Sequence, residues 1–131
     1  MAAFVRLSVL GVTVIMPFLA AASSSVPLSL AGRPIVALLV VGVAFHVFAY
    51  VSNDVIDLPI DRTAPARASS PLVRGTVRPA QGAAVAAAQV PIGVAATWWG
   101  GGHARGVGAL LVACALMLAY NLWGKRSPWP L

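Results

Sequence analysis

Long apolar stretches, separated by short polar ones, constrain the fold of this chain more than any other feature. A helix of about 20 apolar residues crosses the hydrocarbon core of a bilayer. The chain is 60% hydrophobic and 9% charged, whereas soluble domains hold about 45–50% apolar and about 25% charged residues. We therefore predict an all-α, multi-pass transmembrane bundle of about four helices in a single membrane domain, residues 1–131. The predicted helices cover residues 2–22, 35–61, 79–99 and 106–123.

The first apolar stretch, residues 2–22, has two interpretations. Arg6 and the alanines around Ala21 give it the pattern of a secretory signal peptide with a cleavage point. We favour a retained transmembrane helix, because the stretch is longer than the apolar core of a signal peptide and further apolar stretches follow it. Pro17 lies inside the stretch, and membrane helices tolerate proline better than soluble helices do.

The basic residues set the predicted orientation in the membrane. The polar loop 62–78 is rich in arginine, and all basic residues except Arg33 and Arg105 lie on its side of the membrane. The positive-inside rule then places this loop and the N-terminus in the cytoplasm. The net charge of +6 therefore reflects topology and contact with lipid headgroups, and it does not indicate nucleic-acid binding.

The only acidic side chains in the sequence lie at the end of the second stretch: Asp54, Asp57 and Asp61. At about 100° per residue, a helix would place them with Asn53 on one arc about 100° wide, facing the cytoplasm. Carboxylates at the end of a membrane helix are costly unless they are paired or bind a cation. Beside the arginine-rich loop they predict a site for a metal ion and a phosphorylated ligand. The alternative is a solvated helix end whose acids pair with nearby arginines.

Two further features of residues 35–61 concern this site. Pro59 removes the hydrogen bond to the carbonyl of Val55, which predicts a kink near the acids. His46 lies about two turns before Asn53 on the same face, with Tyr50 between them. His46 and Tyr50 are therefore candidates for lining a substrate cavity. For His46 the alternative is a hydrogen-bonded histidine in the interior of the bundle.

Three sequence segments together resemble a known family. They read N-D-V-I-D-L-P-I-D-R at 53–62, S-P-L-V-R-G-T-V-R-P at 70–79 and A-Y-N-L-W-G-K-R-S-P-W-P at 119–130. The first resembles the first aspartate-rich motif of the UbiA superfamily of intramembrane prenyltransferases, and the others resemble the basic loop and the segment after helix four. The resemblance covers nearly the whole chain. It implies an enzyme that transfers an isoprenoid from a prenyl diphosphate to an acceptor, often an aromatic ring, with Mg²⁺ as cofactor.

The resemblance also implies roles for individual residues. Asn53, Asp54 and Asp57 would hold Mg²⁺, with Asp61 close by, and Asp54 and Asp57 would be the catalytic pair. Hard oxygen donors of this kind are the ligands that Mg²⁺ prefers. The candidates for binding the diphosphate oxygens are Arg62, Arg67, Arg74 and Lys125.

The chain departs from the superfamily in its length. Members have about nine helices, more than 131 residues can supply at roughly 20 residues per span. They also carry a second aspartate-rich motif, for which no acidic residue remains in this sequence. We therefore expect the N-terminal half of a UbiA-like fold. Three explanations stay open: a truncated gene product, a degenerate gene, or one part of a split enzyme in which a second chain supplies the missing helices. The alternative within the family is a non-catalytic membrane subunit or truncated remnant.

An alternative outside the family is a small four-helix cation transporter. Carboxylates that bind a transported cation are expected near the middle of the membrane. Here they lie at the end of a predicted helix, beside arginines. This position disfavours the transporter.

Overall fold

The computed structural model describes residues 32–124, which contain helices and no strand. The elements are α2 (Gly32–Ile56), α3 (Leu58–Asp61), the 3-10 turn η2 (Pro65–Arg67), α4 (Pro79–Trp99) and α5 (Ala104–Leu122). The prediction of an all-helical bundle is thus confirmed for this part of the chain. The helix predicted over 2–22 lies outside the described residues.

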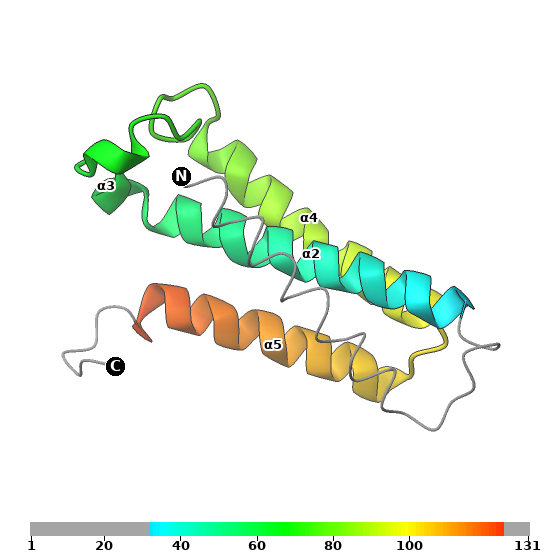
Figure 1. Ribbon diagram of the computed structural model, residues 1–131. Coiled ribbons are helices and arrows are strands. Elements are labelled where there is room, and N and C mark those ends of the chain that lie inside the picture. Colours follow the sequence, from blue (N-terminus) through cyan, green and yellow to red (C-terminus); the bar gives the residue numbers. More distant parts are fainter. Residues whose placement is uncertain (1–31, 125–131) are drawn as a thin grey trace.

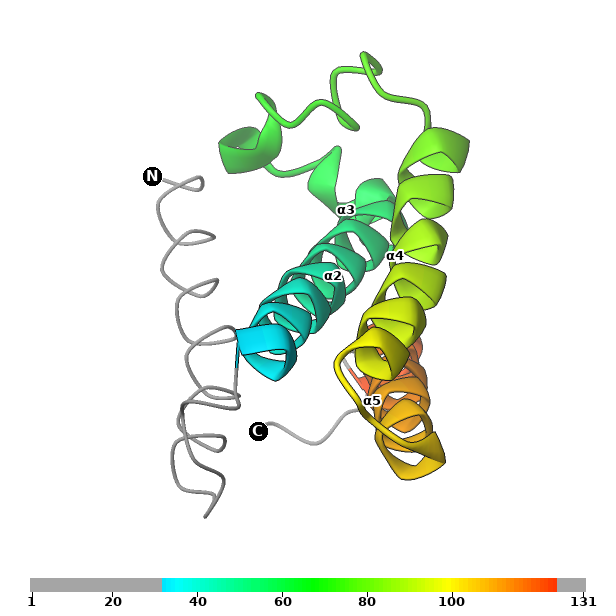
Figure 2. The same ribbon diagram turned by 90° about the vertical axis from the view of Figure 1, so that its right-hand side faces the viewer.

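The three long helices lie side by side along most of their length (Figure 1). Helices α2 and α5 run in the same direction, and α4 runs in the opposite one. Figure 2 shows the loop after α3 passing over one end of this bundle and joining the start of α4. The acidic segment, the arginine-rich loop and the last turn of α5 therefore gather at one end, and the α4–α5 turn lies at the other.

Helix α2 is interrupted where the sequence predicts one continuous helix with a kink over 35–61. It ends at Ile56, and α3 starts at Leu58 with Asp57 between them. The cause is Pro59, which has no N–H to donate and whose ring clashes with the carbonyl four residues earlier. The chain resumes helical bonding at once, because the amides of Ile60 and Asp61 both donate to the Asp57 carbonyl, at 2.9 and 2.8 Å.

Helices α4 and α5 lie close to their predicted positions. Helix α4 has the bounds expected from the sequence, with Pro79 in its first turn, where a missing N–H is harmless. The Gln81 side chain accepts a hydrogen bond from the Arg78 amide at 2.9 Å and so satisfies this free donor at the helix start. Helix α5 starts at Ala104, ahead of the predicted residue 106, and ends at Leu122.

Glycines allow α4 to approach α2 closely. A Cβ atom built on Gly82 would lie 2.8 Å from Cγ2 of Val55, and one built on Gly100 would overlap Ala37. Small residues at such contacts are typical of helices that pack in lipid. At the end of the pair where Gly100 lies, Arg33 donates a hydrogen bond to the Trp99 carbonyl and lies over the Trp99 ring, 5.4 Å from its centroid.

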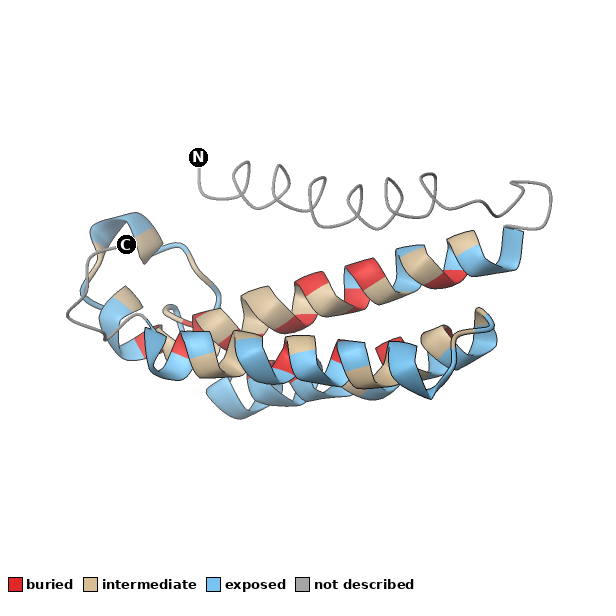
Figure 3. Cartoon of the chain, turned by 90° about the horizontal axis from the view of Figure 1, so that it is seen from below, coloured by how far each residue is buried: buried red, intermediate tan, exposed pale blue. Residues whose placement is uncertain are grey.

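The interior is small and the outer faces are apolar. Buried residues form short patches, mostly along α2, whereas much of α4 and α5 is exposed (Figure 3). The central cluster consists of Phe48, Ala86, Leu110 and Cys114. Large apolar side chains lie exposed on α2 and α5, among them Val43, Leu111, Val112 and Leu116. Such faces need lipid or further helices to cover them.

Helices α2 and α5 are each long and apolar enough to cross a membrane. In their most apolar windows only 28% and 11% of the residues are buried, which is unlike the core helix of a soluble domain. Helix α4, with 21 residues, carries Gln81, Gln89 and Pro91 within its length.

Candidate functional site

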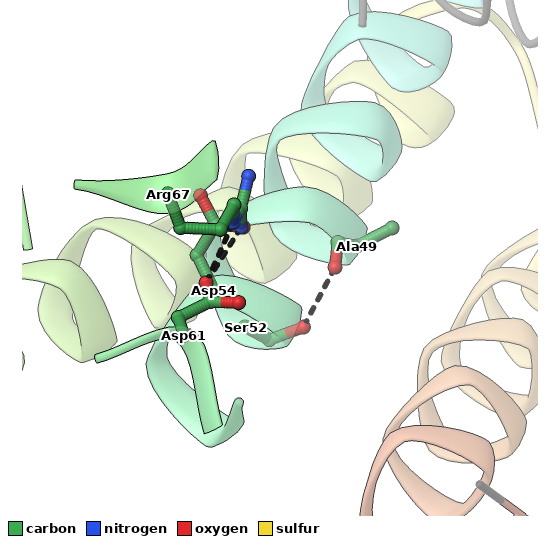
Figure 4. Close-up of polar contacts among 5 residues, drawn as sticks. All are labelled: Ala49, Ser52, Asp54, Asp61 and Arg67. Carbon is green, nitrogen blue, oxygen red and sulfur yellow. Dashed lines mark hydrogen bonds and ion pairs between the residues drawn. The ribbon is translucent and has the colours of Figure 1, made fainter. Parts of the chain in front are cut away.

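The acidic segment and the arginine-rich loop meet in one ion-pair cluster. Nη2 of Arg67 lies 2.7 Å from Oδ1 of Asp54 and 2.7 Å from Oδ2 of Asp61. Nε of Arg67 donates a further hydrogen bond to Oδ2 of Asp61 at 2.9 Å. Figure 4 shows the guanidinium between the two carboxylates. We call these three side chains the Arg67 cluster.

Three separate elements bring the Arg67 cluster together. Asp54 lies in the last turn of α2, Asp61 ends α3 and Arg67 ends η2. The break at Asp57 redirects the chain, so that Asp61 approaches the same nitrogen as Asp54. The turn η2 is closed by hydrogen bonds from the amides of Arg67 and Ala68 to the carbonyls of Ala64 and Pro65, at 2.9 and 3.2 Å. A local turn therefore presents Arg67 to two helix ends.

The Arg67 cluster is largely removed from water. The side chains of Asp54 and Asp61 are 11% and 14% exposed, and that of Arg67 is 23% exposed. The hydrogen bond to Asp61, followed by the bond and the charge attraction to Asp54, raises the pKa of Arg67 above its usual value. Arg67 therefore keeps its charge, and breaking the cluster would leave charges in a partly desolvated place.

The remaining members of the predicted metal motif lie close to this cluster. Asp57 is half-buried at the break between α2 and α3, and Asn53 is half-buried one residue before Asp54. In residues 32–124, no group of three histidine, cysteine or acidic side chains converges into a metal cage. The structure thus brings Asp54 and Asp61 together around a guanidinium, as the alternative interpretation of paired acids also expects.

The acidic oxygens at this place suit Mg²⁺ only if a phosphate group binds together with the ion. Mg²⁺ is usually held by one or two carboxylates together with substrate phosphates and water, and seldom by a cage of protein ligands. The Arg67 cluster offers two carboxylates from different elements whose oxygens already converge on one positive charge. Asp57 is not gathered with them, since no three acidic side chains of residues 32–124 converge. Asp54 and Asp61 are therefore the pair that suits Mg²⁺ when phosphate oxygens and water complete the coordination.

The other predicted diphosphate ligands lie further out. Arg62 and Arg74 are exposed on the same loop as Arg67. Gly75, with φ +74°, turns the chain directly after Arg74, in a conformation that suits glycine. Lys125 lies outside the described residues.

An open cavity of about 300 Å³ lies between α2 and α5, and it reaches the acidic segment only at Asn53. Its polar lining includes His46, Tyr50 and Asn53 from α2 and Asn121 from α5. The rings of His46 and Tyr50 lie 4.4 Å apart, centroid to centroid. The two residues proposed from the sequence to line a substrate cavity thus line the same space. Asn53 connects this space with the acidic segment.

Sequence reasoning missed the polar contact between α5 and α2. Asn121 is 3% exposed, and its Nδ2 lies 3.5 Å from Oγ of Ser52 in a long hydrogen bond. Ser52 in turn donates to the Ala49 carbonyl at 3.1 Å (Figure 4). The available signal was a carboxamide inside an apolar helix, because a polar group at membrane depth is costly and often functional.

A comparison with protein-family models matches residues 9–130 to the UbiA prenyltransferase family. This match covers all the elements described above. No curated protein and no solved structure gave a significant match.

Proposed function

This chain belongs to the UbiA prenyltransferase family, and on that premise we propose that it binds a prenyl diphosphate at the Arg67 cluster and contributes to transfer of the prenyl group. The family consists of membrane-integral enzymes that act on prenyl diphosphates and an acceptor. The acceptor proposed for this chain is an aromatic compound, and the cofactor is Mg²⁺.

The convergence of two carboxylates on one cation is the observation that carries this proposal. Asp54 and Asp61 come from different helices, yet both place an oxygen 2.7 Å from the same nitrogen. Maintaining two carboxylates in a largely desolvated place requires a positive charge. A place built in this way suits a divalent ion that carries a diphosphate.

Each part of the chain has a distinct role in the proposal. Asn53, Asp54, Asp57 and Asp61 would hold the metal, with Asp54 and Asp57 as the catalytic pair. The chemistry supplied by Mg²⁺ held there would be neutralisation of the charge on the leaving diphosphate. Arginines of the loop 62–78 bind the diphosphate oxygens in the charge-assisted, forked geometry that guanidinium groups favour. The candidates are Arg62, Arg67 and Arg74, with Lys125 beyond the described residues.

The cavity between α2 and α5 is proposed to hold the reacting end of the substrates. Its lining includes Asn53 of the proposed metal motif, and Phe45 and Met117 contribute apolar surface. His46 and Tyr50 offer polar groups and ring faces to a bound molecule. A cavity of this size and mixed polarity is typical of small-molecule sites.

Further residues outside this sequence complete the proposed active site. The three acids of this chain all belong to one segment, so they approach a diphosphate from one side. The exposed apolar faces of α2 and α5 leave room for additional helices to pack. We place the second acidic group on such helices, in a further segment of the same protein or in a second chain.

A non-catalytic membrane subunit is the second candidate, and one observation favours it. Arg67 already pairs with both Asp54 and Asp61, so these ion pairs alone explain why the acids are present. A cation transporter is less well supported, because Asp54 lies in the last turn of α2 and not at its middle.

Titration calorimetry on the full chain in detergent separates these candidates. We expect geranyl diphosphate to bind only when Mg²⁺ is present, and we expect an Asp54→Asn/Asp57→Asn double variant to lose this binding. Arg105→Gln is the control, because it changes an exposed charge at the opposite end of the bundle. Unchanged binding in the double variant would refute the site, and a wild-type chain that binds nothing would favour the non-catalytic subunit.

A further inference from the structure

We propose that Arg67 is an exchangeable counter-ion: it holds Asp54 and Asp61 until a metal–diphosphate complex takes over both carboxylates, and it then binds the diphosphate. This inference rests on the proposed function and goes beyond it by giving the order of events. The metal and the diphosphate bind together, because only the pair can release Arg67 without leaving it unpaired.

The first step of the argument is that Arg67 and a metal ion compete for the same carboxylates. Oδ1 of Asp54 and Oδ2 of Asp61 are both 2.7 Å from Nη2 of Arg67. Mg²⁺ lies about 2.0–2.1 Å from its oxygen ligands. An ion bound to both oxygens would therefore lie within about 5 Å of Nη2, where two positive charges in a partly desolvated place repel each other. The two cations compete for the same pair of oxygens.

The second step concerns the state of Arg67 after it is displaced. Its side chain is 23% exposed and keeps its charge. A free metal ion can bind only by separating a charged, partly buried pair, which weakens binding. A diphosphate reverses this penalty, because its oxygens accept forked hydrogen bonds from guanidinium groups. The diphosphate must then raise the affinity for the metal ion, and the metal ion must raise the affinity for the diphosphate by the same factor.

The third step is that Arg67 can move without disturbing the helices. It ends a three-residue turn, η2, whose hydrogen bonds are local. The second part of the loop is held by Leu72, which is buried and lies beside Gly82 of α4. The exchange therefore requires motion of the segment 62–70 only.

The test measures metal binding to the full chain in detergent by the electron paramagnetic resonance signal of free Mn²⁺, with and without inorganic pyrophosphate. Without pyrophosphate, we expect Arg67→Gln to bind Mn²⁺ about tenfold more tightly than the wild type, because the competing cation is gone. Arg67→Lys keeps a competing charge and stays close to the wild type. Arg105→Gln, a control that changes an exposed charge at the opposite end of the bundle, also stays close to it.

Pyrophosphate gives the second readout. It should tighten Mn²⁺ binding by a much larger factor in the wild type than in Arg67→Gln. Equal Mn²⁺ affinities of wild type and Arg67→Gln without pyrophosphate would overturn the exchange and leave the proposed function standing. Absence of Mn²⁺ binding in every variant, even with pyrophosphate, would overturn both.

A spin label supplies a measurement that keeps Arg67 intact. Ser69 is exposed two residues beyond Arg67, and a nitroxide on Ser69→Cys, in a Cys114→Ala background, reports motion of the segment. We expect saturating Mg²⁺ alone to narrow its spectrum and added pyrophosphate to broaden it again. A spectrum that stays the same while metal binds would contradict the exchange.

Discussion

The contact between Gly82 and Val55 allows a quantitative prediction. In Gly82→Ala the new methyl group would lie 2.8 Å from Cγ2 of Val55, whereas carbon atoms in contact are about 3.5–4.0 Å apart. Helix α4 must therefore move by roughly 1 Å, since the branched Val55 side chain is stiff. Such overpacking costs about 1–3 kcal/mol. A gain in helix propensity of about 0.5–1 kcal/mol offsets part of it. We expect a net loss of about 1 kcal/mol.

The measurement is unfolding in mixed detergent micelles, followed by circular dichroism. Gly108→Ala is the control, because a Cβ atom at Gly108 meets nothing within 4 Å. Gly108→Ala should gain stability from helix propensity alone. Replacement of glycine by alanine should therefore lower the free energy of unfolding at Gly82 and raise it at Gly108. In the double variant Gly82→Ala/Val55→Ala the clash disappears. The double variant should therefore be about 1 kcal/mol more stable than the sum of the two single effects predicts. Equal effects at Gly82 and Gly108 would refute the close approach of α4 to α2.

Three other predictions follow from the charges. The pKa of Arg67 is raised in the folded state. The stabilisation that charged Arg67 gives to the fold is therefore complete below the usual arginine pKa and is lost only as the pH rises above that value. The difference in unfolding free energy between wild type and Arg67→Gln should stay constant from pH 7 to 10. A cysteine replacing exposed Ala68, with Cys114 replaced by alanine, should react with an impermeant thiol reagent only from the cytoplasmic side, and reaction from the opposite side would reverse the predicted topology. Arg33→Gln should lose about 0.5–1 kcal/mol through its contact with Trp99, as measured by unfolding, with Mn²⁺ affinity unchanged.

The bounds of α4 and the disturbance at Pro59 could be predicted because each depends on residues close by in the sequence. Pro79 marks the start of α4, and the paired Trp98 and Trp99 mark its end, so both bounds follow from the sequence. The disturbance by Pro59 was also predictable, since a missing N–H acts on the residue four positions earlier. Its extent was not: one kinked helix was expected, and the structure has two helices, α2 and α3, with Asp57 between them.

The pairing within the candidate site could not be predicted, because it depends on the path of an irregular loop. Spacing placed Asp54 and Asp61 near several arginines, but it did not distinguish Arg67 from Arg62 or Arg74. The turn η2 places the Arg67 guanidinium within hydrogen-bond distance of both Asp54 and Asp61. Asn121 escaped notice for a related reason. Its neighbour Ser52 is distant in the sequence, and the contact depends on how α5 packs against α2.

The enclosure of Arg67 has a practical consequence for digestion by trypsin. That protease must take a free arginine side chain into its own specificity pocket before it can cut. Arg62 and Arg74 extend from the surface, so the chain should be cut after both, whereas Arg78 is protected by the proline that follows it. The peptide between the two cuts should remain whole, with its central arginine resistant as long as the two carboxylates hold it.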